Sequence, residues 1–135
     1  MTDALTIFAS HFTPPGGFPA RGQALCIPSL TGSADAFLSL ALANDRRDEG
    51  RVVLAITPGI PDADRLADDL RLLTTPHPPS PTTHPSSPIP HPSSLRILEF
   101  PPKLADDKSA LGTRLKTISA LKAWSLNPYP CVVIA

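Results

Sequence analysis

The sequence predicts an α/β domain with a mostly parallel sheet and helices on both of its faces. Three observations lead to this fold class. Short apolar runs alternate with amphipathic runs in the order β-α-β-α-linker-β-α-β. The apolar runs are continuous instead of alternating with polar residues, which is typical of parallel strands covered on both faces. The chain has 135 residues, which is room for one domain at most.

The predicted domain is interrupted by a linker and preceded by an extension. We place the extension, the first half-domain, the linker and the second half-domain at residues 1–23, 24–73, 74–94 and 95–135. In the extension, Leu5, Phe8 and Phe12 recur at helical spacing and predict a short helix, which the break from Pro14 to Gly17 would end. Because the chain ends within a strand-like run, we expect a sheet that is incomplete at its C-terminus.

The first half-domain contains two strand-helix units. Residues 24–28 predict a short first strand. The helix after it would bury Phe37, Leu38, Ala41 and Leu42. Residues 52–56 form the clearest strand-like run, and their β-branched composition predicts a central strand. The next helix begins at Pro61 and would bury Ala63, Leu66, Ala67, Leu70 and Leu73.

The linker is a loose seven-residue repeat in which His77, His84 and His91 each precede a proline. The segment lacks backbone donors and apolar mass, so we expect it to be extended and disordered. Metal capture by the three histidines is an alternative, which we do not favour because a flexible segment offers no preorganised site. A PxxP ligand at Pro78 to Pro81 is a second alternative.

The second half-domain contains a strand over residues 95–100, a long helix and a last strand over residues 131–135. The apolar stripe of the helix would consist of Leu111, Leu115, Ile118 and Leu121. Its charged residues Arg114, Lys116 and Lys122 are expected in solvent. Trp124 fits either the edge of the core or a partner contact, and we favour the core.

The turn between the first strand and the first helix lies where a phosphate-binding loop would lie. It reads Ser29-Leu30-Thr31-Gly32-Ser33-Ala34-Asp35-Ala36. Aligned with the pattern G-x-x-x-x-G-K-[ST], Ser29 and Ala34 replace the two glycines, Asp35 replaces the lysine and Ala36 replaces the metal-binding hydroxyl. The turn therefore resembles a P-loop that has lost nucleotide binding, and no cofactor is expected.

No catalytic or metal-binding set is predicted either. Asp62 and Asp64 fit charges at the start of a helix, although a metal-binding pair is an alternative. Nothing in the sequence places Arg51 or Arg65 at the degenerate turn. Three of the four histidines lie in the linker, and His11 precedes the fold. An NTPase with an unorthodox loop is the enzymatic alternative.

Composition bounds the environment of the chain. Lys+Arg and Asp+Glu are equal at 12 each, so we expect neither a basic nucleic-acid footprint nor a membrane-surface patch. The N-terminus carries Asp3 and lacks a secretory pattern, and no apolar run is long enough to span a bilayer, so a cytoplasmic location is expected. Cys26 and Cys131 lie in apolar runs and are expected to be buried thiols, with a disulfide or a catalytic thiol as alternatives.

Three stretches resemble one family when taken in order. They are the turn Leu30 to Ala34, the run Asp62 to Leu70 after a strand, and the run Thr113 to Leu121 before the last strand. Together they are similar to the N-terminal part of the bacterial transcription-repair coupling factor Mfd, whose first module resembles domain 1a of the excision-repair protein UvrB. The chain departs from many members of the family after Phe100, where Pro101-Pro102-Lys103-Leu104 stands.

The resemblance implies a nucleotide-free P-loop-like module that is non-catalytic alone. In that family the ATP-driven DNA translocase and the region that recruits UvrA follow the first module, as do the parts that act on RNA polymerase. The resemblance therefore implies an N-terminal fragment of a factor in transcription-coupled nucleotide excision repair, with partners bound through parts beyond Ala135. A free-standing interaction module with a degenerate P-loop is the alternative, and a nucleotide-binding protein is a third hypothesis.

Overall fold

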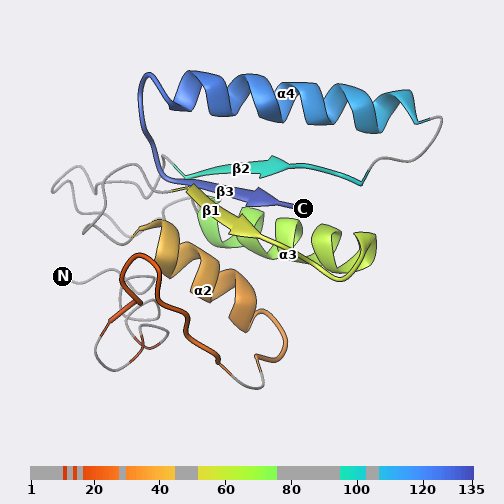
Figure 1. The fold of residues 1–135 in the computed structure, drawn as a ribbon. Coiled ribbons are helices and arrows are strands. Elements are labelled where there is room, and N and C mark those ends of the chain that lie inside the picture. The colour runs from red at the N-terminus through yellow and green to blue at the C-terminus, as the bar shows by residue number, and fades with distance from the viewer. Residues whose placement is uncertain are drawn as a thin grey trace, which may run out of the picture.

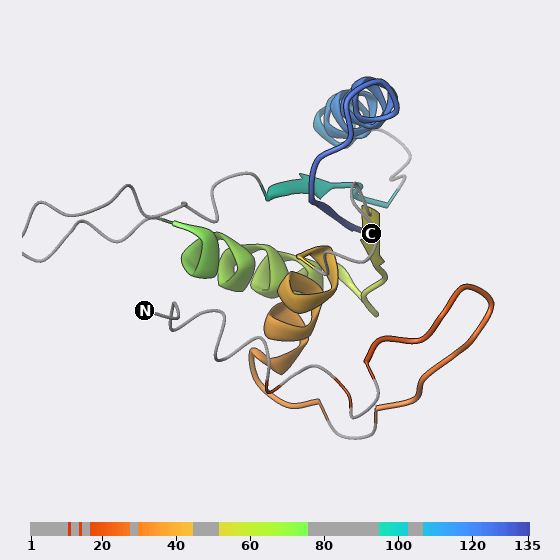
Figure 2. The same cartoon turned by 90° about the vertical axis from the view of Figure 1, so that its left-hand side faces the viewer.

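The computed structural model describes residues 11, 14, 17–27, 30–44, 52–75, 95–102 and 107–135. In this part of the chain, a small parallel sheet lies between two helices on one face and one helix on the other (Figures 1 and 2). In chain order the elements are α2 (Ala34–Ala43), β1 (Val52–Ala55), α3 (Ile60–Thr74), β2 (Arg96–Glu99), α4 (Lys108–Trp124) and β3 (Cys131–Ile134). The α/β class is confirmed, whereas the predicted N-terminal helix and nearly all of the linker lie outside the described residues.

The sheet has the order β1-β3-β2, so β3 is the central strand. Val53 and Ile97 are both in register with Val132, and backbone bonds such as Phe100 N–H to Ile134 O (2.7 Å) extend the ladder. The prediction that residues 52–56 form the central strand is wrong. All four residues of β3 are buried, whereas Leu54 of β1 is 60% exposed. Both strands are equally apolar, so strand order decides which of them is covered.

The predicted first strand is also wrong. Residues 24–27 belong to no strand, and Leu25 and Ile27 are exposed. The chain before them makes a local turn, in which Gln23 N–H donates to Ala20 O (3.0 Å) and Gly22 has a φ of 82°. An apolar composition alone does not make a run pair with a sheet, since β-propensity depends on tertiary context, and this run lies outside the sheet. Cys26 is consequently exposed, contrary to the expectation that it is buried, while Cys131 is buried as expected.

The apolar core lies between one face of β3 and the helices α2 and α3. Val132 and Ile134 of β3 contact a cluster that consists of Ala36, Leu40, Ala43, Leu66, Ala67 and Leu70. Ala63 and Leu73 pack against this cluster, so the predicted face of α3 is confirmed. For α2 the predicted face is wrong except at Ala41, because a helix that is apolar almost all round does not specify by its pattern which side is covered.

Helix α4 covers the opposite face of the sheet with an unexpected side. Its buried residues are Ala110 and Thr117, while Leu111, Leu115 and Ile118 of the predicted stripe are 52–57% exposed. Thr117 Oγ1 donates to the β2 carbonyl Glu99 O at 2.5 Å. The predicted buried stripe is therefore wrong for three of its four residues, and the fourth, Leu121, is partly buried. Small and polar side chains of α4 make its contact with β2.

The ends of α4 are fixed by specific bonds. Asp107 caps its N-terminus by accepting from the backbone N–H groups of Ser109 (2.9 Å) and Ala110 (3.1 Å). Near its C-terminus, Trp124 is half-buried and its Nε1–H donates to Tyr129 O at 2.8 Å. Trp124 thus lies at the edge of the packed region, as expected.

Candidate functional site at the degenerate turn

The turn that precedes α2 leads into a helix N-terminus, but no strand leads into the turn, because residues 24–27 belong to no strand. The strand-loop-helix frame expected from the sequence is therefore not formed in the described residues. Gly32 has a φ of 61°, a conformation that favours glycine, and α2 begins two residues later. The N-cap residue Ser33 makes no side-chain capping bond. The first-turn amide of Ala36 donates instead to the Oδ1 atom of Asp35, at 2.8 Å. A carboxylate of the chain itself therefore interacts with the amide that a phosphate would use.

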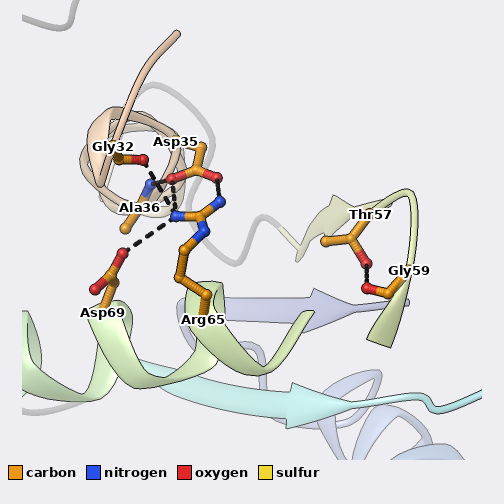
Figure 3. A network of polar contacts seen from close by, with 7 residues as sticks. All are labelled: Gly32, Asp35, Ala36, Thr57, Gly59, Arg65 and Asp69. Atoms are coloured by element: carbon orange, nitrogen blue, oxygen red, sulfur yellow. Dashed lines mark hydrogen bonds and ion pairs between the residues drawn. The ribbon is translucent and has the colours of Figure 1, made fainter. Parts of the chain in front are cut away.

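Arg65 of α3 reaches across to this carboxylate (Figure 3). Its Nη2 atom lies 2.6 Å from Asp35 Oδ2, and its Nη1 atom lies 3.2 Å from Asp35 Oδ1. Nη1 also donates to Gly32 O at 3.1 Å and lies 3.3 Å from Asp69 Oδ2. The guanidinium therefore joins the turn to α3 by a bidentate ion pair, a carbonyl contact and a second carboxylate.

The electrostatics of this cluster follow from its geometry. The hydrogen bonds from Arg65 lower the pKa of Asp35, and this effect outweighs the partial burial of the carboxyl group. In return, Asp35 raises the pKa of Arg65. The turn therefore contains an acid that is ionised at neutral pH, and the nearby guanidinium is already bonded to two carboxylates. An incoming phosphate would meet a negative charge and an engaged cation.

The structure places the other residues of the predicted turn as follows. The turn ends with Gly32 and Ser33, and α2 begins with Ala34, Asp35 and Ala36. Ser29 lies outside the described residues. The expectation that nothing brings Arg65 to the turn is wrong. The spacing from Arg65 to Asp69 is a visible i,i+4 pair, but Asp35 is 30 residues away in sequence, so no local pattern indicates that contact.

A second feature is a cleft of about 620 Å³ at the carboxyl ends of the three strands, between the starts of α3 and α4. Clefts at this edge of parallel sheets bind ligands in many α/β proteins. Some of its polar groups have partners within the chain: Thr57 Oγ1 lies 3.3 Å from Gly59 O and 3.2 Å from Ala135 O. The Arg114 guanidinium stacks 4.3 Å from the Phe100 ring centroid and donates to Pro101 O. The expectation that Arg114 is solvated is therefore wrong.

The acidic residues of α3 have separate positions. Asp62 lies in the first turn, as expected of a helix-start charge, and Asp64 lines the cleft. Within the described ranges, no group of three or more His, Cys, Asp or Glu side chains could hold a metal ion. No helix in the same ranges is long and apolar enough to cross a membrane.

Comparisons of the chain with protein-family models, with curated proteins and with solved structures found no match.

Proposed function

We propose that the chain is a non-catalytic α/β interaction module of P-loop-like ancestry. The observation that carries the proposal is the bidentate pair between Arg65 and Asp35 at the start of α2. In the alignment with G-x-x-x-x-G-K-[ST], Asp35 stands where a P-loop has its lysine, and Arg65 is bonded to that carboxylate. The turn acts in this proposal as a structural link between α2 and α3 and not as a nucleotide site.

The setting that we propose is transcription-coupled nucleotide excision repair. Its basis is the resemblance of the three ordered stretches to the first module of the transcription-repair coupling factor, in which a P-loop-like turn is likewise degenerate. Asp35 and Ala36 agree with that resemblance, since neither can act on a triphosphate or a metal. Under this proposal the ATP-driven activity belongs to other parts of the full-length protein.

Calorimetric titration of the purified chain with ATP and Mg²⁺ tests the non-catalytic assignment. We expect no heat of binding at millimolar ATP, and none for ADP or inorganic phosphate. The variant Arg65→Gln is the matched control, because it removes the cation nearest to the turn. A micromolar affinity that Arg65→Gln abolishes would show a working phosphate site and overturn the proposal.

The coding sequence beyond Ala135 tests the repair setting separately. We expect it to continue into a further helix and then into helicase-type motifs that contain an intact G-x-x-x-x-G-K-[ST]. An unrelated continuation would contradict the repair setting. The non-catalytic module would then stand by itself as a free-standing interaction protein.

A further inference from the structure

The outer side of α4 carries a regular row of exposed residues, which we call the α4 ridge. Its members follow one another at intervals of three, four, three and four: Lys108, Leu111, Leu115, Ile118 and Lys122. All five are exposed, and the three apolar members are 57%, 55% and 52% exposed. In the part of the chain that the structure describes, no element lies over this side of α4 (Figures 1 and 2).

The spacing of the ridge is that of a coiled-coil seam. Apolar residues that alternate at intervals of three and four form a single narrow row, along which a second helix packs side by side. The ridge spans 15 residues, or about 21 Å along the axis. A partner helix of about four turns would therefore cover it.

The charges of α4 define what kind of helix fits. Between Lys108 and Trp124 the ionisable residues are Lys108, Arg114, Lys116 and Lys122, so every one is cationic. Two of these lysines stand in the ridge itself, one at each end. Carboxylates on a partner helix would meet the lysines at both ends, while its apolar side chains cover Leu111, Leu115 and Ile118.

A second copy of the chain fits poorly by the same criterion. If two α4 helices pair antiparallel about Leu115, Lys108 of each copy faces Lys122 of the other. If they pair in parallel and in register, each lysine faces its own copy. Like charges therefore meet at both ends of the seam in either orientation, which opposes self-association.

A membrane surface also fits poorly. Helices that lie in the bilayer interface bury a broad apolar face, often with Trp or Phe at its centre. The apolar row of α4 is a single residue wide and is closed by lysines at both ends. Trp124 does not extend the apolar row, since it is half-buried and donates to Tyr129 O.

We propose that the α4 ridge is a docking site for an acidic amphipathic helix of a partner protein. The partner would carry apolar residues at alternating intervals of three and four and Asp or Glu at both ends of that row. The proposal names a partner class for the interaction module proposed above, and it depends on a surface distant from the Asp35–Arg65 pair. Its test is therefore independent of the nucleotide titration.

Two fluorescent 21-residue peptides titrated with the full chain test this proposal by fluorescence anisotropy. Both carry leucines at the three-four spacing, one with glutamates at the ends of the row and the other with lysines there. We expect the glutamate peptide to bind at least tenfold more tightly than the lysine peptide. The charge-reversed chain Lys108→Glu/Lys122→Glu should invert this preference.

Exposed apolar residues provide matched variants. Leu115→Gln and, separately, Ile118→Gln should each weaken binding of the glutamate peptide about tenfold. Leu72→Gln should leave it unchanged, because Leu72 is 71% exposed on α3, a helix on the other face. Circular dichroism checks that the variants stay folded, as exposed substitutions should.

Four outcomes would overturn the proposal. They are failure of the glutamate peptide to bind, equal binding of the two peptides, binding that Leu115→Gln and Ile118→Gln leave unchanged, and self-association or anionic-vesicle binding that Leu115→Gln abolishes. Sedimentation of the chain alone and flotation with phosphatidylserine vesicles measure the last outcome.

Discussion

The two faces of the sheet are covered by helices of opposite character. On one face, α2 and α3 turn apolar residues inward, among them Leu40, Leu66 and Leu70. The outward charges of α3 form ion pairs, as in the bond of Arg65 to Asp35. On the other face, α4 turns Ala110 and Thr117 inward, leaves Leu111 and Leu115 in solvent, and has only cations among its ionisable residues. The core of the domain thus lies on the α2 and α3 face of the sheet, whereas the helix on the other face exposes an apolar row to solvent.

This difference shows what helical periodicity does and does not specify. A regular apolar row indicates that a helix has an apolar side, but it does not say what that side contacts. In α3 the row meets the sheet. In α4 a buried hydrogen bond and small side chains meet the sheet, and the row is left for another occupant.

A matched pair of leucine truncations compares the buried apolar row of α3 with the exposed row of α4, and we expect the largest effect here. Leu70 is fully buried, so Leu70→Ala should lower the free energy of unfolding by about 2–5 kcal/mol. Leu115→Ala on α4 should change it by less than about 0.5 kcal/mol, because Leu115 is 55% exposed. Urea denaturation measures both values. Equal losses would mean that the α4 ridge is covered within the chain itself.

The two cysteines probe the covering of β3. Val132 faces α2 and α3, so strand alternation places Cys131 on the other side of β3, which faces α4. Burial raises the pKa of its thiol, whereas Cys26 is exposed. A thiol reagent at pH 8 should therefore modify Cys26 rapidly and Cys131 on the order of 100-fold more slowly, since access requires local opening. With Cys26→Ser as control, fast labelling of Cys131 would show that α4 is only loosely attached.

The bond between Thr117 and Glu99 O tests what fixes the orientation of α4. Thr117→Val keeps the shape of the side chain but leaves the carbonyl without this donor, so it should cost about 1–3 kcal/mol. Thr113 is the control, because its Oγ1 donates to Ser109 O within the same helix and Thr113→Val should cost less. If both variants lose the same stability, the bond to β2 does not determine which side of α4 is buried.

The sequence predicts the α/β class, three of the strands and three helices, because continuous apolar runs and i,i+4 spacing are local properties. The sequence does not predict which runs pair in the sheet or in what order, because contacts between distant segments determine both. Residues 24–27 are strand-like in composition but pair with nothing in the sheet, and residues 52–55 are an edge strand although they look central. The sequence shows that Asp35 and Ala36 do not match the lysine and hydroxyl of the P-loop pattern. It does not show the contact of Arg65 with Asp35, because that contact spans 30 residues of sequence.

The smallest expected effect concerns the Asp35–Arg65 pair, which joins α2 to α3. Because Arg65 lowers the pKa of Asp35 in the folded state, the unfolded chain takes up the proton first as the pH falls. The stabilisation is therefore complete above the ordinary value near 3.8 and is lost as the pH falls through the lower folded pKa. Both side chains are about one-third or more exposed, so solvent screening keeps the contribution of the pair small.

A double-mutant cycle with Asp35→Asn and Arg65→Gln measures the coupling free energy of this pair. Urea denaturation at pH 7 and at pH 2 gives the stability of each variant. The coupling free energy should be larger at pH 7 than at pH 2, because Asp35 takes up its proton as the pH falls. The pair between Arg71 and Asp68 is the control and should couple more weakly, since both residues lie on α3 and Arg71 is shared with Glu99 of β2. A coupling of zero at pH 7 would mean that the cluster does not stabilise the packing of α2 on α3. The packing of α2 on α3 would then depend on the apolar contacts of the core, such as those of Leu40, Leu66 and Leu70.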